Sequence, residues 1–304
     1  MKSVSVREIR SAIDKSGYVL ELRLTPLLER AGFHVFVSEQ FQDQDTGKSR
    51  EIDLLGWKPI EIQEHQQRIG GRTLVTHDRL DVRLVIECKS TTTPLVFFSS
   101  RDHNATGYAM FGGYPKRAWD FDNTSRESRS RPVLVQRFGS PDDPPVIWGE
   151  PLDSLLGLEK FHSNWNSAPI TSRFAKLISK KQSHTLEWEL DHGGIYPSID
   201  KLCRAASYVH LEWKRDGLPP QDEANHFHLL MTYPVLVVSD ELFECRVSQR
   251  NYSVKRADQL FLDWQLEGQN IKGRFRIAVV RQRRLAAYLN QIADDIAGVT
   301  AALL

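Results

Sequence analysis

Two acidic residues and one lysine occur in two stretches that have the pattern of β-strands. Asp53 lies within REIDLLGW, and Glu87 and Lys89 close the run DVRLVIECKS. Side chains alternate across a sheet, so Glu87 and Lys89 are expected on one face, about 7 Å apart along the strand. The alternate positions, expected to face a core, are Val82, Leu84, Ile86 and Cys88. The pattern predicts a carboxylate and an ammonium emerging together where this strand ends.

Asp53 is flanked by isoleucine and leucine. Alternation divides its strand into two faces, with Ile52 and Leu54 on one and Glu51, Asp53 and Leu55 on the other. A charge within so apolar a run is costly to bury unless it is paired or binds a cation. If the two strands pair, Asp53 and Glu87 converge.

Two converging carboxylates form a hard oxygen site of the kind Mg²⁺ prefers, and Mn²⁺ is expected to substitute. Such a metal lowers the pKa of a bound water and neutralises a phosphate, while a nearby lysine orients the water or stabilises the transition state. The residue types at this spacing therefore predict metal-assisted phosphodiester hydrolysis.

The elements that position these residues are a helix followed by three strands. Residues 4–31 have helical character, with a break near Gly17, an irregularity at Pro26 and a left-handed cap at Gly32. Alternatively, Thr25 and Pro26 are the N-cap and first residue of a separate helix. FHVFVSEQF and REIDLLGW predict a hairpin, a polar segment at 58–71 interrupts the pattern, and DVRLVIECKS is the third strand.

The second half of the chain adds further elements. A Pro-rich and Gly-rich segment at about 94–194 is interpreted as an insertion after the third strand, within a single domain spanning 1–304 whose core is 1–93 and 195–304. The periodicity predicts a helix over 197–216, a buried strand at TYPVLVVS, a strand at RFRIAVV and a closing helix at RLAAYLNQIADDIAGV. The expected fold class is α/β, with a mixed central sheet flanked by helices.

IDLLG followed by VIECKS on this α-β-β-β start resembles the PD-(D/E)xK nuclease superfamily, over residues 17–90. The resemblance implies a restriction-endonuclease-like αβββαβ core, with the later helix and strand completing it. It implies that Asp53 and Glu87 bind metal, that the Cys88 backbone carbonyl contributes a ligand and that Lys89 assists hydrolysis. Glu21, on the preceding helix, occupies the place of a further family acid. Ile52 departs from the family's proline.

By family analogy the resemblance also implies a DNA endonuclease that acts in restriction or antiviral defence. Two alternatives stay open: a non-catalytic nucleic-acid-binding or assembly subunit that keeps the fold, and an RNA-cleaving enzyme. No GxxxxGK[ST] phosphate loop is present, so sensing or ATPase activity would come from a protein partner. A homodimer would suit duplex cleavage.

Each chemical interpretation has a structural alternative. The ExK pattern is also that of an ordinary ion pair, a helix glutamate such as Glu21 is commonly solvated, and the run Ser90 to Thr93 fits a turn as well as a phosphate contact. Cys88 is expected to pack and not to react. Two arginine groups are candidate phosphate contacts or solvated faces: Arg126, Arg129, Arg131 and Arg137, and Arg274, Arg276, Arg281, Arg283 and Arg284.

Composition sets broad limits on these hypotheses. The chain has 304 residues, 40% of them hydrophobic, and a formal net charge of +1, so any nucleic-acid surface must be a local patch. Its three cysteines are far apart and suggest neither a disulfide framework nor a zinc site. With no apolar run long enough to span a bilayer and no signal peptide, we expect a cytoplasmic protein without membrane contact.

Overall fold

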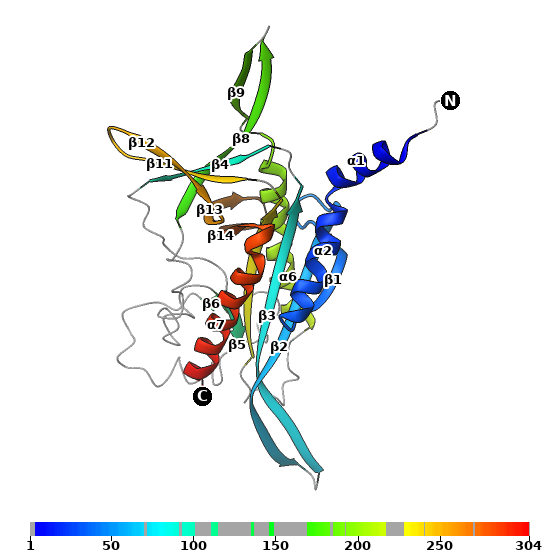
Figure 1. Cartoon of the computed structure of the whole chain (residues 1–304). Helices are drawn as coiled ribbons and strands as arrows, with labels where there is room; N and C mark the ends of the chain where they lie inside the picture. The colour runs from blue at the N-terminus through cyan, green and yellow to red at the C-terminus, as the bar shows by residue number, and fades with distance from the viewer. Residues whose placement is uncertain are drawn as a thin grey trace.

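The chain folds into a mixed β-sheet with helices on both faces (Figure 1). The computed structural model describes residues 4–69, 72–90, 93–100, 111–114, 135–136, 146–148, 169–182, 185–191, 193–216, 228–239, 241–269 and 271–303. The helices are α1 (Val6–Ser16), α2 (Tyr18–Arg30), α6 (Tyr196–Asp216), the short η3 (Gln282–Arg284) and α7 (Leu285–Leu303). The predicted α/β class is therefore confirmed.

Strands β1 to β7 are His34–Gln42, Ser49–Ile69, Arg72–Lys89, Leu95–Ser100, Phe111–Tyr114, Val135–Gln136 and Val146–Trp148. Strands β8 to β14 are Ile170–Gln182, Thr185–Asp191, His228–Val238, Leu242–Val247, Tyr252–Ala257, Gln259–Glu267 and Lys272–Arg281. In the described part of the chain they follow the order β1-β2-β3-β10-β14-β13-β8-β4-β11-β12, with β5, β6, β7 and β9 attached beside this path. β3, β10 and β14 run parallel to one another, whereas β1, β2 and β3 are antiparallel.

The N-terminal helices begin and end at local signals in the sequence. Ser5 and Glu8 form a reciprocal capping box at the start of α1. Gly17, with φ +86°, separates α1 from α2, as predicted. Gly32, with φ +85°, ends α2, and the N–H groups of Gly32 and Phe33 donate to carbonyl oxygens of the last helical turn.

Pro26 lies inside α2 and does not start a new helix, so the alternative reading of Thr25 as an N-cap is wrong. The hydroxyl of Thr25 instead donates to the carbonyl oxygen of Glu21, 3.1 Å away, as in a continuous helix. Leu24 and Leu28, on either side of the proline, are fully buried. Tertiary packing holds the helix together where Pro26 lacks an N–H.

β2 and β3 form a long two-stranded ribbon that extends beyond the rest of the sheet (Figure 1). Their pairing runs from Leu54–Ile86 to Ile69–Arg72, with one irregularity between Glu61 and Gln63. The expectation that the polar segment 58–71 interrupts the strands is therefore wrong. Residues 58–71 lack the alternation of apolar and polar residues by which strands are recognised. A ribbon that extends beyond the sheet has no core face, so its sequence does not need that alternation.

Two hydrophobic clusters cover the two faces of the sheet. One is built on Leu24 and Leu28 of α2 and Leu285, Leu289 and Ile292 of α7, against Val82, Leu84, Ile86 and Cys88 of β3. The other is built on Ile199, Leu202 and Ala206 of α6 against Val85 of β3. The alternation predicted for β3 is thus confirmed, and the face that carries Glu87 is the α6 face.

The alternation predicted for β2 is wrong at one point. Leu54 packs in the α2–α7 cluster, but Ile52 packs in the α6 cluster beside Leu55. Ser38 on β1, which lies between the paired positions Val37–Leu54 and Glu39–Ile52, has a φ of +57°. This left-handed residue breaks the regular pleat opposite Asp53, and the two-residue period is lost there.

The predicted C-terminal elements are confirmed as α6, β10, β14 and α7. β10 is buried along its length and pairs with β3 from Arg79 to Lys89. β11, β12 and β13 were not predicted. Two of their neighbours, β4 and β8, come from the segment interpreted as an insertion, and most of that segment lies outside the described residues. None of the described helices is long and apolar enough to cross a bilayer.

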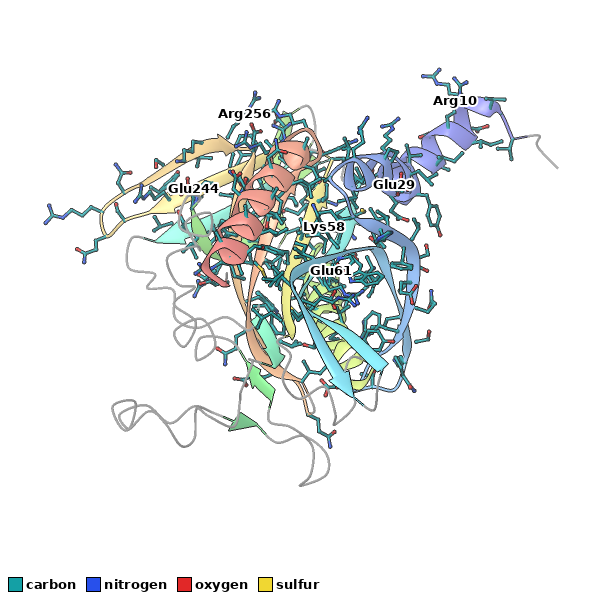
Figure 2. All side chains as sticks on the ribbon, turned by 90° about the horizontal axis from the view of Figure 1, so that it is seen from below. Arg10, Glu29, Lys58, Glu61, Glu244 and Arg256 are labelled. Carbon is teal, nitrogen blue, oxygen red and sulfur yellow. The ribbon has the colours of Figure 1, made fainter. Side chains whose placement is uncertain are left out.

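Figure 2 gives a second view of α1 and of the β11–β12 hairpin. α1, marked by Arg10, and the β11–β12 hairpin, marked by Arg256 and Glu244, lie on opposite sides of the molecule in both views. The candidate site described next lies between them, at the end of the sheet where β3 and β10 finish.

Candidate active site

Asp53 lies where β2 leaves the ladder that it forms with β3. The last paired residues are Leu54 and Ile86, and beyond them the Cys88 backbone N–H donates to Asp53 Oδ2 over 2.7 Å. The carboxylate thus satisfies a donor that a continued β2 backbone would have bonded. Because Asp53 is only 7% exposed, its charge is held in a mostly dry position at the end of the strand pair.

Glu87 is the next carboxylate and comes from β3, on the face covered by α6. It accepts a hydrogen bond from the hydroxyl of Ser198, near the start of α6. Lys201, one turn further along the same helix, places its Nζ against Glu87 Oε2 and 2.8 Å from Asp53 Oδ1. Both strand carboxylates are therefore within contact of one cation, which confirms that Asp53 and Glu87 converge.

Glu21 brings a third carboxylate from the first turn of α2. It is 6% exposed, and Asp53 is the strongest charge acting on it. A Cβ atom built on Gly17 would lie 3.7 Å from Glu21 Oε1 and 3.8 Å from the Cys88 carbonyl oxygen. The side chain of Glu21 and the carbonyl of Cys88 thus approach the same point beside Gly17, where the break between α1 and α2 starts the helix that carries Glu21.

The electrostatics of this group of acids are not balanced. Burial raises the pKa of Glu87 to about 7, the charge of Asp53 adds to the rise, and Lys201 opposes it. Burial raises the pKa of Glu21 to about 7 as well, again with a contribution from Asp53. Burial opposes the charge of Lys201, but Glu87 and Asp53 outweigh it and raise the pKa of this ammonium. Three acids and one ammonium therefore share a site in which further positive charge would be stabilising.

Lys201 was not predicted from the sequence. The signal available was a lysine three residues after Ser198, beside the apolar stripe of Ile199 and Leu202. A lysine at the edge of such a stripe usually extends its ammonium to water, so the pattern alone did not single it out. Only the fold brings it to Asp53, 148 positions away in the chain.

Lys89 lies on the last residue of β3 and is partly exposed. Its backbone carbonyl accepts a hydrogen bond from the Ser239 N–H over 3.2 Å. Its ammonium makes no hydrogen bond or ion pair with the residues that the structure describes. Lys89 is close to Glu87 in sequence, but among the described residues it is Lys201 that makes the ion pairs with both acids.

The remaining candidates divide into four groups. Cys88 is buried, and burial raises the pKa of its thiol far above the usual range, which agrees with a packing role. Arg276 is 4% exposed and pairs with Asp263, so it is not a surface phosphate contact. Arg281 and Arg283 pair with Asp258 at the surface. Outside the described residues lie Thr91 and Thr92 as well as Arg126, Arg129, Arg131 and Arg137.

The donor set fits a hard divalent cation. Carboxylates from Glu21, Asp53 and Glu87 and the carbonyl oxygen of Cys88 are the oxygen ligands that Mg²⁺ and Mn²⁺ take. In the part of the chain that the structure describes, no group of three or more His, Cys, Asp or Glu side chains is already spaced as a ligand set. Lys201 holds the two strand carboxylates together, so cation binding at this point requires the ammonium to move.

A second charged group lies further along α6. Arg204 Nη1 contacts Asp43 Oδ1 at 3.1 Å and Asp45 Oδ2 at 2.8 Å, and Arg204 Nε contacts Asp200 Oδ2 at 2.9 Å. Arg50 Nε donates to Asp43 Oδ2 at 2.6 Å. These residues, called the Arg204 cluster below, attach the β1–β2 turn to α6. They fix the helix that carries Ser198 and Lys201.

No family model, curated protein or solved structure matches this chain. The site itself therefore carries the functional information: three acids and two lysines, positioned by α2, β2, β3 and α6.

Proposed function

We propose that this protein is a Mg²⁺-dependent nuclease of the PD-(D/E)xK superfamily, hydrolysing phosphodiester bonds in DNA as an endonuclease. The observation that carries the proposal is the convergence of Asp53 and Glu87, from the ends of adjacent strands, on a single cation position. Two buried acids that converge on one position offer the oxygen ligands that a divalent cation takes.

The order of elements supports the same proposal. α2, β1, β2 and β3 follow one another with antiparallel strands, and α6 leads into β10, which lies parallel to β3. An αβββαβ core of this kind is what the restriction-endonuclease-like fold requires. On this interpretation β4 to β9 and the residues between them belong to an insertion after the catalytic strand.

The chain's own residues have distinct tasks in the proposed reaction. Asp53 and Glu87 would hold the metal, with Glu21 and the Cys88 carbonyl beside them. When bound, Mg²⁺ would lower the pKa of a coordinated water and neutralise the phosphate. Lys89, at the end of β3, would orient the attacking water or contact a phosphate oxygen. Lys201 neutralises Asp53 and Glu87 and would have to leave this position for a metal to occupy it.

A second candidate function rests on Lys201. An ammonium that bridges Asp53 and Glu87 is also what a non-catalytic relative would need, since it compensates the acids permanently. Such a protein would bind nucleic acid or a partner without cutting. Burial is the main cause of the raised pKa of Glu21 and Glu87, and the charge of Asp53 adds to it. What favours the catalytic proposal is the third buried carboxylate, Glu21, beside a pair of acids that one ammonium already bridges.

The test is cleavage of supercoiled DNA, linear DNA and RNA by the purified protein in Mg²⁺, Mn²⁺ or EDTA. We expect metal-dependent cutting of the closed circle, which has no ends and therefore reports endonuclease activity. Asp53→Asn and Lys89→Ala are expected to lower the rate by roughly a thousandfold or more. Asp294→Asn on α7 and Lys48→Ala on the β1–β2 turn, both exposed, are the matched controls.

If wild type and variants are equally inactive on all three substrates in the presence of metal, the nuclease proposal fails. Retained binding of nucleic acid by that inactive wild type would support the non-catalytic candidate. Cleavage confined to RNA would correct the substrate and leave the proposed chemistry standing.

A further inference from the structure

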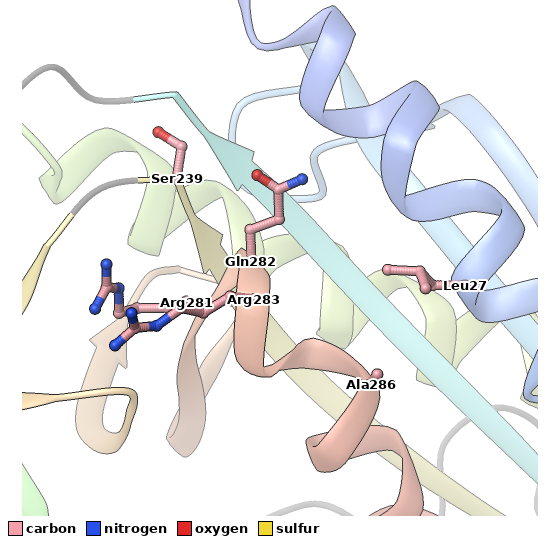
Figure 3. Close-up of a pocket in the computed structure, with 6 residues that line it drawn as sticks. All are labelled: Leu27, Ser239, Arg281, Gln282, Arg283 and Ala286. Atoms are coloured by element: carbon pink, nitrogen blue, oxygen red, sulfur yellow. The ribbon is translucent and has the colours of Figure 1, made fainter.

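A pocket of about 400 Å³ opens beside the candidate active site (Figure 3). Its lining consists of Leu27, Ser239, Arg281, Gln282, Arg283 and Ala286. These residues come from α2, the end of β10, the end of β14, η3 and the start of α7. Figure 3 shows Arg281 and Arg283 side by side on one wall of the pocket, with Leu27 and Ala286 on the other side of Gln282.

The pocket lies at the edge of the sheet where Lys89 ends β3. Val238 on β10 pairs with Lys89 of β3 on one side and with Arg281 of β14 on the other. With strands about 4.8 Å apart, the backbones of Lys89 and Arg281 are separated by about 10 Å. Parallel strands in α/β proteins bind ligands at their carboxyl ends, and these are the carboxyl ends of three parallel strands.

The charges of the pocket suit an anion. Asp258, in the turn between β12 and β13, pairs with both Arg281 and Arg283, so the three groups together carry one net positive charge. Arg281 Nε is buried and has no hydrogen-bond partner among the described residues. Arg284, next along the chain, is exposed. Guanidinium groups present a planar fork that matches two oxygens of a phosphate.

We propose that this pocket binds a backbone phosphate of the DNA strand that enters the site, with Arg281 and Arg283 as the phosphate contacts. The proposal rests on the proposed function and extends it to how substrate is held. The separation of about 10 Å between the two strand ends places this phosphate within a few nucleotides of the one near Lys89. Leu27 and Ala286 offer the apolar surface on which a sugar can rest.

The test is binding measured without chemistry. Fluorescence anisotropy of labelled 20-base-pair DNA and RNA duplexes, in EDTA and across 50–200 mM KCl, gives the Kd and its salt slope for the full chain. The double variant Arg281→Gln with Arg283→Gln is expected to bind DNA roughly tenfold more weakly, with a salt slope smaller by about 2. Arg250→Gln, on the exposed turn between β11 and β12, is the matched control and should bind like wild type.

The variant Asp258→Asn distinguishes a role of Arg281 and Arg283 in DNA binding from a purely structural role. Since Arg281 and Arg283 also tie β14 and η3 to the β12–β13 turn, losing them lowers stability, and thermal unfolding will register this. Asp258→Asn breaks the same ion pairs yet leaves both arginines, so it is expected to bind DNA several-fold more tightly. A purely structural role predicts instead that it loses stability without gaining affinity.

Equal Kd and equal salt slope for the double arginine variant and wild type would overturn the proposal. That result leaves the nuclease standing if wild type still cuts DNA in Mg²⁺. Wild type that binds DNA through these arginines but never cuts it would support the pocket and contradict the nuclease. A loss on RNA duplexes equal to that on DNA supports a contact with phosphate, since the two backbones share that group.

Discussion

Two charged groups on α6 are built from the same kinds of residue and behave in opposite ways. In the Arg204 cluster, burial raises the pKa of Asp43, but hydrogen bonds from the Asp45 N–H, Thr46 and Arg50 outweigh it and lower the pKa to about 2. Around Lys201, in contrast, the pKa of Glu87 is raised to about 7. The first group is satisfied by the protein alone, whereas the second holds acids that the protein does not fully neutralise.

The difference lies in how many cations the acids share. Asp43, Asp45 and Asp200 share two guanidinium groups, and these fork-shaped donors reach several oxygens at once. Glu21, Asp53 and Glu87 share the one ammonium of Lys201. Satisfied ion pairs indicate a structural element, and under-compensated acids indicate a place where a ligand supplies the missing charge. Proximity of charges alone would not have separated the two.

The largest expected effect is on the free energy of unfolding, and it tests the structural role of the Arg204 cluster. Arg204→Met leaves the buried Asp43 with Arg50 alone and removes the cation of the half-buried Asp45, so the free energy of unfolding should fall by about 3 kcal/mol. Urea denaturation measures this. Arg250→Met, on an exposed turn, is the control. Added Mg²⁺ should not restore stability, and full recovery in Mg²⁺ would show that the Arg204 cluster is itself a metal site.

The next effect is the pH dependence of stability without metal. The pKa of Glu87 is about 7 in the folded protein and ordinarily 4.5, so the folded state holds the proton more tightly between these limits. Stability from this group is therefore present below pH 4.5 and is lost as the pH rises to about 7, by about 2 kcal/mol. Glu87→Gln should remove most of this loss, as measured by urea denaturation between pH 4.5 and 8.

Asp43 acts with the opposite sign. Its lowered pKa stabilises the fold above pH 3.8, the ordinary pKa of an aspartate, and that stability is lost as the pH falls towards 2. Asp43→Asn should therefore flatten the acid side of the stability profile, and Glu87→Gln the neutral side. If the two substitutions changed the same side, the contrast between the groups would be wrong.

A third effect concerns the affinity for metal. Lys201→Met removes the ammonium from between Asp53 and Glu87, so Mn²⁺ should bind roughly tenfold more tightly, as measured by electron paramagnetic resonance of free Mn²⁺. Lys201→Arg keeps the charge and is the control, expected to bind as weakly as wild type. Unchanged or weaker binding by Lys201→Met would show that metal does not take the place of the ammonium.

The smallest expected effect tests the hydrogen bond between Ser198 and Glu87. Ser198→Ala removes the hydroxyl that donates to this carboxylate, so the pKa of Glu87 should rise further. We expect a loss of up to about 1 kcal/mol at pH 8, where Glu87 is ionised, and almost none at pH 5. A loss of equal size at both values would mean that Ser198 contributes only packing and helix capping.

The sequence allowed much of the core and part of the site to be predicted, because local patterns determine both. Alternation in DVRLVIECKS placed Cys88 in the core and Glu87 on the opposite face, as found. Gly17 and Gly32 marked the ends of α2 through their need for positive φ. The pairing of two apolar strands brought Asp53 and Glu87 together because their register follows from the core.

Other features depend on contacts that no local pattern encodes. Lys201 is an ordinary helix lysine until α6 packs against β3. The shift in alternation at Ile52 follows from the left-handed conformation of Ser38 on the neighbouring strand. A serine in the sequence does not predict such a conformation. β12 was missed because almost all of its residues are exposed and it has no core face, while β11 and β13 each pair on one side with a distant strand, β4 and β8.

Because of the long ribbon, the outer and inner parts of β3 are expected to differ in their stability against local opening. Its inner part, from Arg79 to Lys89, pairs with β10 along its whole length and with β2 as far as Ile86. Its outer part, up to Asp78, pairs with β2 alone in the described structure, and an isolated two-stranded ribbon is marginally stable in water. Amide hydrogen exchange should therefore divide this single strand of 18 residues at Arg79, into an outer arm that opens readily and an inner segment protected to the level of global unfolding.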